Sequence, residues 1–480
     1  MCAEREAHLP KSWTYLAWAT WLALLIWACW SWRERALFMD ASFQVFHMLL
    51  EERPLIYHYR FCNAFVQWLP LLAIKLKLPL AVVLWAYSFN VWLLYFAIWW
   101  ILHYALDHQR LAWVWLLFLT LISLDSFYFI PPELFQGTGW LLVLWAWWQR
   151  RLRYNVRIFG LVAICLMAIV IFAHSLLLPL LLYCAVWFAI DDSQRQDRVT
   201  LGLVVLGTLA LGGIHEWWFT DWYDAMKKEE FWRHARQYWP RYWAIPAHGK
   251  AWDKAVKFYY FWPILFGLMS AIYIGQRQWG KLLWMWGFSL GFLLLLHIGS
   301  PATAYRFYSE ANYMPLSVVV ALPFVFDGWD AFRQIAQRRP WQWVWPYGAW
   351  AFLALIVFVR LNAIVHNHDH FVRRLNWMVD QIGNARKELY TNRLLMPIRR
   401  APMELIVMEW SVPYESVLAT ALIHPDSAGE VFIRKDFARF NKWISDTLQG
   451  WFLSEFDQLP ADTLPRHYIN LNNHPFRQWQ

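Results

Sequence analysis

Long apolar runs separated by short charged gaps limit the possible folds of this chain more than any other feature. A membrane-spanning helix needs about 20 consecutive, mostly apolar residues. Only 16% of the 480 residues are charged, whereas soluble proteins carry about 25%. The sequence therefore predicts an all-α polytopic membrane protein with about eleven spans, at residues 13–30, 80–106, 111–124, 133–148, 158–172, 176–190, 200–214, 258–274, 282–296, 316–326 and 344–359.

The distribution of lysine and arginine predicts which gaps face the cytoplasm, because cationic loops stay on that side of a membrane. These residues crowd into every second gap, such as the one with Arg150, Arg151, Arg153 and Arg157. Segment 61–75 is apolar enough to be a further span, but a crossing there would move every later basic gap outside. We therefore expect an amphipathic interfacial helix at this segment and a cytoplasmic N-terminus.

The outward side then carries four loops and a tail. The tail, 361–480, is long enough for a small α+β extracytoplasmic domain, and 1–360 forms the transmembrane domain. Residue patterns in the tail predict a helix at 371–389 and strands at 404–408 and 430–434. The four predicted outer loops are 31–79, 125–137, 215–257 and 299–315.

Composition indicates which partners the chain has. Its formal net charge of +9 is spread over many loops, which favours anionic lipid headgroups over nucleic acid as the partner. The 39 tryptophans suit the headgroup level of a membrane. The five cysteines have no CxxC spacing, so the sequence signals neither a zinc site nor a disulfide framework.

Two acids in the outer loops are candidates for catalysis. Asp40 lies among apolar neighbours beyond the first span, where a carboxylate is costly unless it has a function or a partner. It could act as a general base or metal ligand, or it could cap the helix that follows. Glu133 follows the stiff pair Pro131-Pro132 and begins a helix, so catalysis and helix capping are both open.

Other polar residues on the same side could bind a substrate. Arg306 does not serve orientation there, so its planar guanidinium suits a phosphate group; the alternative is an ion pair with Glu310 one turn later. His174, at an outward hairpin, could bind the same phosphate or be structural. Tyr128, close to the possible metal ligand Asp125, could line a sugar site or belong to the interfacial aromatic belt.

The tract HNHDH at residues 366–370 suggests a metal site of low specificity. His366 and His370 would share one helix face and could bind a divalent metal ion. The alternative is a polar collar at the end of the last span. Asp125 and Glu133 complete the set of metal candidates, and the sequence leaves metal dependence undetermined.

The order of these features resembles the GT-C superfamily of polytopic glycosyltransferases. In that layout the first outer loop carries an acid, here Asp40. A juxtamembrane segment follows, here 54–72, which begins with the run PLIYHY that contains His58. A second acidic outer loop, a late loop with Tyr305 and Arg306 before a proline, and a terminal domain outside the membrane fit as well.

The resemblance implies transfer of a sugar from a polyprenyl-phosphate donor with inversion at the anomeric carbon. It implies that Asp40 is the general base, that Glu133 holds the acceptor or a divalent metal ion, and that Arg306 binds the phosphate. Such an enzyme would belong to the cell envelope, in a bacterial inner membrane. The further substrate-binding candidates are His174, Tyr305, Tyr128, Glu310 and His58.

Two other classes of protein stay open. A lipid or polysaccharide transporter needs ionisable residues inside its spans, and the predicted spans are nearly free of them. A non-catalytic membrane scaffold subunit could dock partners of a membrane complex through the tail and through the Trp-rich loop 215–257. The sequence does not separate this scaffold from an enzyme.

Overall fold

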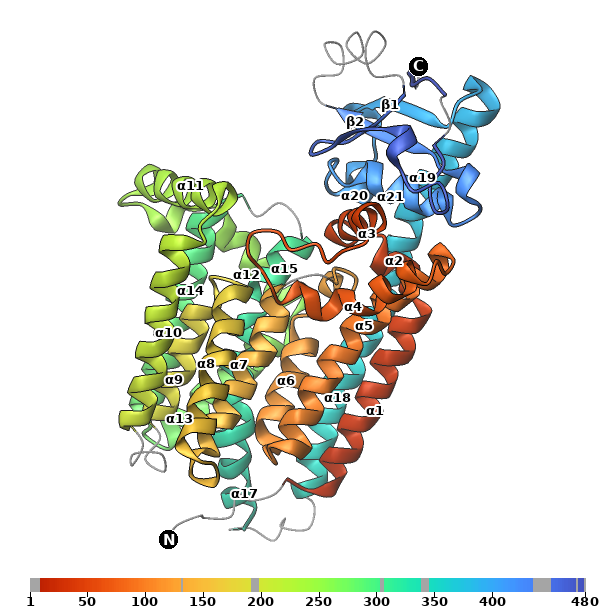
Figure 1. Cartoon of the computed structure of the whole chain (residues 1–480). Helices are drawn as coiled ribbons and strands as arrows, with labels where there is room; N and C mark the ends of the chain where they lie inside the picture. The colour runs from red at the N-terminus through yellow and green to blue at the C-terminus, as the bar shows by residue number, and fades with distance from the viewer. Residues whose placement is uncertain are drawn as a thin grey trace.

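The computed structural model describes residues 9–130, 133–190, 198–302, 306–337, 345–434, 450–471 and 474–478. Each of the eleven apolar runs predicted to be spans forms a helix, and these helices run side by side in one bundle (Figure 1). They are α1 (Lys11–Trp30), α5 (Leu80–Trp100), α6 (Gln109–Leu121), α7 (Glu133–Gln149), α8 (Val156–Ala173), α9 (Leu177–Ile190), α10 (Arg198–Trp218), α13 (Phe261–Gly275), α14 (Trp279–Gly299), α16 (Pro315–Pro323) and α18 (Trp345–His366).

The described helices include seven that are long and apolar enough to cross a membrane, and an eighth if α12 (Ala247–Phe258) and α13, bent by 94°, form one broken span. The chain is therefore a mostly helical, multi-pass membrane protein. Other bundle helices are shorter: α6 has 13 residues, or about 20 Å at 1.5 Å per residue. All of its side chains from Leu111 to Leu121 are buried, so protein and not lipid surrounds it. A total of eleven crossings stays a prediction.

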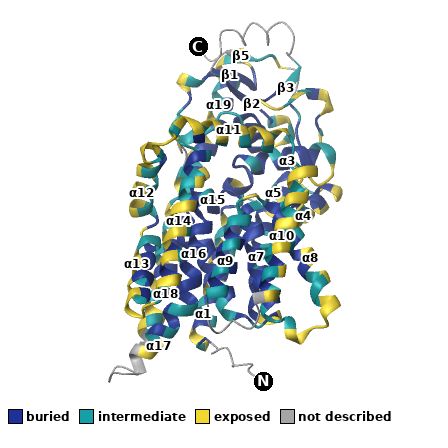
Figure 2. Ribbon diagram, turned by 90° about the vertical axis from the view of Figure 1, so that its left-hand side faces the viewer, coloured by how far each residue is buried: buried dark blue, intermediate teal, exposed yellow. Residues whose placement is uncertain are grey.

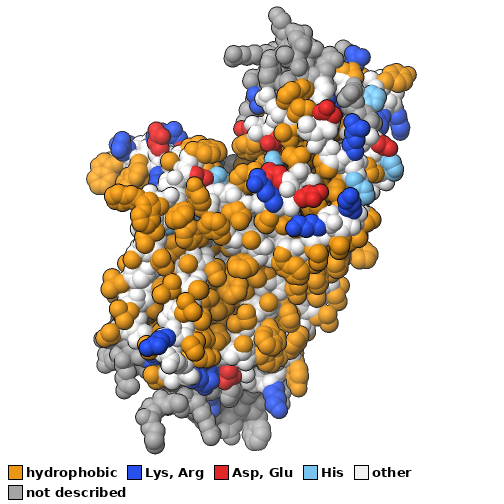
Figure 3. Space-filling model, in the orientation of Figure 1, with side chains coloured by type: hydrophobic (Ala, Val, Ile, Leu, Met, Phe, Trp, Pro, Cys, Tyr) orange, Lys and Arg blue, Asp and Glu red, His pale blue; other side chains and the backbone are white. Residues whose placement is uncertain are grey.

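The outer surface of the bundle matches this assignment. Figure 3 shows a broad belt of hydrophobic side chains, with charged side chains above and below it. Inside the bundle α16 is buried along its whole length (Figure 2). Burial on all sides explains why inner helices such as α6 and α16 are apolar all around and do not carry a single apolar stripe.

One end of the bundle, called the upper face below, carries the polar loops and the C-terminal region (Figure 1). The segment expected at the interface forms α4, a helix of 13 residues that begins two residues later than predicted. Its place in a membrane interface stays a prediction. The other helices of this face are α2 (Trp32–Ala36), α3 (Asp40–Glu51), α11 (Trp222–Tyr238), α12 and α15 (Arg306–Tyr313), with α4 at Asn63–Lys75.

The C-terminal region begins with α19 (His368–Leu389), which continues the direction of α18 after a break at Asn367. Three parallel strands follow in the order β2–β1–β5, and α20 (Met403–Ile406) and α21 (Val412–Ala421) connect the first two strands along the chain. A two-stranded antiparallel pair lies beside them. The strands are β1 (Arg393–Pro397), β2 (Glu430–Arg434), β3 (Trp451–Leu453), β4 (Gln458–Pro460) and β5 (Arg477–Gln478).

The sequence predicted this region only in part. The helix at 371–389 and the strand at 430–434 are confirmed. The strand at 404–408 is wrong, because Met403–Ile406 forms α20 and the carbonyl of Leu405 accepts a hydrogen bond of 2.8 Å from Arg374. The side chain of Arg374, 31 residues away, therefore supplies the hydrogen bond that a neighbouring strand would have supplied. The periodicity of the sequence cannot reveal such a contact.

The first outer loop packs against the C-terminal region. Helix α3 contacts α21, and the rings of Phe46 and Phe452 stack with centroids 4.6 Å apart. One hydrophobic cluster runs from the bundle through α3 to Tyr414 and Leu418. This packing places the start of α3, where Asp40 lies, between the membrane bundle and the C-terminal region.

Candidate functional site

Two groups of polar side chains lie on the upper face, and both contain residues that the sequence singled out. We name them the Asp40 cluster and the Asp125 cluster. The Asp40 cluster consists of Asp40, Arg60, Asn63, Glu133 and Tyr223, from the first, second and third outer loops. The Asp125 cluster consists of Asp125, Arg306, Glu310, Arg360 and Asn367.

Asp40 is the first residue of α3 and has no hydrogen-bond or ion-pair partner among the described residues. It follows Met39, the residue in the N-cap position, whose side chain makes no capping hydrogen bond. The carboxylate of Asp40 makes no hydrogen bond or ion pair with any residue that the structure describes. The helix-cap alternative for Asp40 is therefore not supported, and a partly buried carboxylate is left unpaired.

Glu133 begins α7 and is held by two groups from the first outer loop. Asn63 Nδ2 donates to Oε1 at 2.9 Å, and Arg60 Nη1 donates to Oε2 at 3.3 Å. These contacts join the start of α4 to the start of α7. They fix the Glu133 carboxylate near Asp40, so that two acids and one guanidinium share the same part of the upper face.

The surroundings of Asp40 change its acidity. Burial, together with the negative charge of Glu133, raises the pKa of Asp40 to about 7, although Arg60 acts in the opposite direction. The charge of Asp40 also acts on the nearby hydroxyls of Tyr223 and Tyr87. A carboxyl group with a pKa near neutrality accepts a proton far more readily than an ordinary aspartate does.

His58 and His174 lie beside the Asp40 cluster. His58 is paired with Asp221, the N-cap residue of α11, and stacks on Tyr223 with ring centroids 4.5 Å apart. The loop is tight at this point, since His58 takes φ +54°. His174 is partly buried, and its Nδ1 accepts the backbone N–H of Leu176 at 3.1 Å. Burial, with the charge of Arg60, lowers the pKa of His174 to about 3, so this imidazole is neutral.

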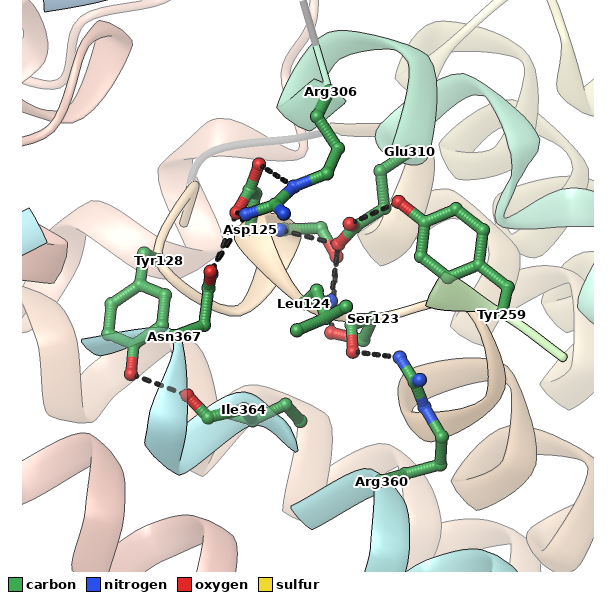
Figure 4. Close-up of polar contacts among 11 residues, drawn as sticks. Ser123, Leu124, Asp125, Tyr128, Tyr259, Arg306, Glu310, Arg360, Ile364 and Asn367 are labelled. Carbon is green, nitrogen blue, oxygen red and sulfur yellow. Dashed lines mark hydrogen bonds and ion pairs between the residues drawn. The ribbon is translucent and has the colours of Figure 1, made fainter. Parts of the chain in front are cut away.

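Arg306 is engaged by a carboxylate of its own protein (Figure 4). Its Nε donates to Asp125 Oδ2 at 2.7 Å and its Nη2 donates to Asp125 Oδ1 at 2.5 Å. Asn367, at the break between α18 and α19, accepts from Nη2 and donates to Asp125, both at 2.7 Å. The Arg306–Glu310 ion pair is not formed because Asp125 takes the guanidinium, and Nη1 alone keeps no hydrogen bond to the described residues.

Glu310 of α15 stabilises the loop that contains Asp125. Its Oε1 accepts the backbone N–H of Leu124 at 2.5 Å and that of Ser126 at 2.7 Å, and Oε2 accepts the hydroxyl of Tyr259 at 2.7 Å (Figure 4). Glu310 is fully buried. Burial, together with the charge of Asp125, raises the pKa of its carboxyl.

Two arginines and one glutamate thus satisfy backbone groups of the loop at 122–130 and of the end of α6. Arg360 donates to the carbonyls of Thr120 and Ser123 at 3.1 and 2.8 Å, and Arg35 donates to the carbonyl of Phe127 at 3.0 Å. A loop buried at the edge of a membrane needs such partners, because lipid offers none. The second outer loop is therefore fixed by side chains that come from elsewhere in the chain.

Tyr128 also has a role inside the protein. It is fully buried. Its hydroxyl accepts from Trp27 Nε1 at 3.0 Å and donates to the carbonyl of Ile364 at 2.9 Å, and its ring stacks on Phe371 with centroids 4.2 Å apart. Tyr128 thus joins α1, the second outer loop and α19.

Three aromatic rings connect the two clusters. Phe38, two residues before Asp40, packs edge-to-face on Phe307 with centroids 5.4 Å apart. Phe129 contacts both, at 6.2 Å from Phe38 and 5.2 Å from Phe307. Asp40 and Arg306 therefore lie on the same face, separated by an apolar partition. In Figure 3 the upper face is notched between α11 and the C-terminal region.

The metal candidates do not come together. In the described ranges, no group of three or more His, Cys, Asp and Glu side chains is placed so that it could hold a metal ion. His366 Nδ1 contacts its own helix at the carbonyl of Asn362, and His370 lies in the next helix, α19. Tyr305 and Pro131-Pro132 lie outside the described residues.

Arg60 and Asn63 are the residues that sequence reasoning missed. Arg60 lies in the predicted first outer loop, so the argument used for Arg306 applied to it equally. Asn63 gave no signal, because a single asparagine at a helix start is common. A comparison of the chain with protein-family models, curated proteins and solved structures finds no match.

Proposed function

We propose that this chain is an integral membrane glycosyltransferase that moves a sugar from a polyprenyl-phosphate donor to an acceptor hydroxyl at the upper face. The observation that carries the proposal is the unpaired Asp40 carboxylate, with a pKa of about 7, beside Glu133 and Arg60. Leaving a carboxylate unpaired among apolar side chains costs stability. Strongly shifted acids with this surrounding are typical of functional sites.

The proposed step is a single displacement. The acceptor hydroxyl gives its proton to Asp40 as its oxygen forms a bond with the anomeric carbon of the sugar. The bond between that carbon and the phosphate oxygen breaks, and its electron pair leaves with the polyprenyl phosphate. The configuration at the anomeric carbon inverts, and the proton stays on Asp40 until water removes it.

Arg60 is the cation best placed for the leaving phosphate. It is in electrostatic contact with Asp40 and Glu133, and a fixed guanidinium stabilises charge that develops on a phosphate oxygen. Arg306, expected from the sequence to bind the phosphate, has only Nη1 without a hydrogen bond to the described residues, because Asp125 and Asn367 hold its other nitrogens. Glu133 orients the acceptor through its carboxylate oxygens.

The donor's lipid chain and the membrane orientation complete the proposal. A groove of about 130 Å³ between α1 and α5 is lined only by Trp, Phe and Leu side chains, which suits an apolar prenyl chain. The lower ends of the helices carry Arg150, Arg151 and Arg153, so the positive-inside bias supports a cytoplasmic lower face. The upper face and the C-terminal region would then be extracytoplasmic, in a bacterial inner membrane.

The test is transfer by the purified full chain in lipid nanodiscs, with a panel of polyprenyl-phosphate sugars and a mixture of lipid and saccharide acceptors. We expect a product with inverted anomeric configuration, formed about 1,000-fold more slowly by Asp40→Asn. Asp369→Asn is the matched control, because Asp369 is an exposed carboxylate of the same face whose ion-pair partner among the described residues is Arg373. Turnover that is unchanged in Asp40→Asn would contradict the site, and no turnover with any donor would favour the scaffold or transporter alternative.

A further inference from the structure

The turn that presents Asp40 has a backbone conformation that its sequence does not favour. Met39 takes φ +53° and ψ −123°, and the carbonyl of Phe38 accepts the N–H of Ala41 at 3.1 Å. These angles match the first central position of a type II′ turn, which normally requires glycine. A methionine there needs other contacts to hold it.

The contact that holds Met39 comes from the C-terminal region, 376 residues away. The backbone N–H of Met39 donates to Glu415 Oε1 of α21 at 3.0 Å. Glu415 is fully buried. A charged acceptor makes this hydrogen bond stronger than one to a neutral group.

Glu415 is itself fixed by two further side chains. Arg374 of α19 donates from Nε to Oε2 and from Nη2 to Oε1, each at 2.7 Å, and Ser411 donates to Oε1 at 2.7 Å. The same guanidinium lies over the ring of Phe38 at 5.2 Å. The backbone N–H of Met39 and the ring of the preceding residue, Phe38, therefore both contact the buried Arg374–Glu415 ion pair.

We propose that Glu415 and Arg374 are positioning residues, through which the C-terminal region holds the Met39 turn and thereby keeps the Asp40 carboxylate unpaired beside Glu133. The proposal rests on the function proposed above, and it assigns to the C-terminal region a direct task in that function. The acid itself cannot set this geometry, because its side chain makes no bond to any described residue.

A second contact keeps α3 docked independently of Glu415. His47 Nε2 lies 3.0 Å from Asp457 Oδ2, and Asp457 also accepts the hydroxyl of Tyr414. Loss of the Glu415 contact should therefore free the turn at 38–41 without releasing the helix. This separation makes the proposal testable by local measurements on the full chain.

The variant is Glu415→Gln, and the matched control is Glu430→Gln. Glu430 is equally buried and pairs with Arg393 at 3.0 Å in the same region, but no hydrogen bond or ion pair joins it to residues 38–41. Hydrogen exchange is measured on peptides that cover the turn, in nanodiscs. We expect about tenfold faster exchange or more at residues 38–43 in Glu415→Gln alone, because the opening is local.

Activity supplies a second readout. Displacing a catalytic group by about 1 Å can lower turnover about 100-fold, so we expect kcat to fall ~10- to 100-fold in Glu415→Gln with little change in KM. Water that reaches Asp40 would also move the acidic limb of the pH profile to lower pH, towards that of an ordinary aspartate. Met39→Gly in the Glu415→Gln background should restore part of kcat, since glycine takes a positive φ without strain.

Unchanged exchange at residues 38–43 in Glu415→Gln, or equal acceleration in Glu430→Gln, would overturn the proposal. If Glu415→Gln does not fold, Ser411→Ala removes one hydrogen bond to Glu415 and gives the same comparison in milder form. If the wild-type chain transfers no sugar from any donor, the proposed function fails. The exchange data then still decide whether the C-terminal region holds the turn.

Discussion

Two acids of the upper face, Asp40 and Asp125, stand in opposite environments. Asp125 accepts from Arg306 and from Asn367, and no oxygen of its carboxylate is left without a partner. Asp40 has no partner among the described residues and has a pKa of about 7. Two carboxylates on one face of one protein thus differ by whether the fold supplies a cation at hydrogen-bond distance.

This difference separates polar residues that stabilise the fold from polar residues that are available for chemistry. A buried loop must have its backbone groups and charges satisfied, and Asp125, Glu310 and Arg306 do this for the second outer loop. Asp40 does nothing comparable for the first loop. A costly group without a structural task is the better candidate for chemistry.

The largest expected effect separates the two acids by activity. Asp40→Asn should lower kcat about 1,000-fold, since a positioned general base contributes about 10²- to 10⁴-fold. Asp125→Asn should retain kcat within about threefold for the folded fraction, because a group of this kind acts through the fold. Rates are normalised to folded protein by size-exclusion chromatography. Equal losses in both variants would erase the distinction between the clusters.

The next effect separates them by stability. Asp125→Asn leaves Arg306 without its counter-ion and should lower the free energy of unfolding by about 3 kcal/mol. Thermal unfolding followed by tryptophan fluorescence measures it. The control is Asp330→Asn, which breaks the half-exposed pair with Arg110 at the lower face. It should lower the free energy of unfolding by less than about 1 kcal/mol. If Asp125→Asn costs no more than this control, the Asp125 cluster is not structural.

A smaller effect tests the neighbour of Asp40. Glu133→Gln removes the negative charge that helps to raise the pKa of Asp40, so the acidic limb of the pH profile should move to lower pH. We expect a loss of about tenfold in kcat/KM, or about 1.4 kcal/mol. Glu229→Gln on exposed α11 is the control. If the acidic limb of the pH profile of Glu133→Gln stays where it is in the wild type, the charge of Glu133 does not act on Asp40.

The smallest effect concerns the stability cost of the unpaired acid. Its folded pKa of about 7 lies above the ordinary value of 3.8, so the native state holds the proton more tightly. The contribution of Asp40 to stability is therefore greatest below about pH 4, falls as the pH rises to about 7, and stays level above. Asp40→Asn should be more stable than wild type by about 1–2 kcal/mol at pH 8, and equal at pH 4. A variant that loses stability at pH 8 would mean that Asp40 has a hidden partner.

Helix identity in the bundle was predictable from local sequence. Each apolar run became a helix, and α8 begins after Asn155, whose side chain accepts the N–H of Arg157 as a cap. The strand at 404–408 failed because its carbonyls are taken by Arg374, and the short spans such as α6 could not be told from full crossings. These failures arise where a distant side chain, or protein in place of lipid, changes the environment.

Local sequence was enough to predict that this chain crosses a membrane many times and gathers its acids and its Trp-rich loop at one face. Hydropathy and charge act on each segment as it meets lipid or water, so they can be read along the chain. Only the tertiary structure decided that Arg306 belongs to Asp125, 181 residues earlier, and that Glu415 holds the turn before Asp40. Such pairings depend on which side chains meet in space, because a hydrogen bond or ion pair forms only when its two atoms are about 3 Å apart. The separation of two residues along the chain does not determine that distance.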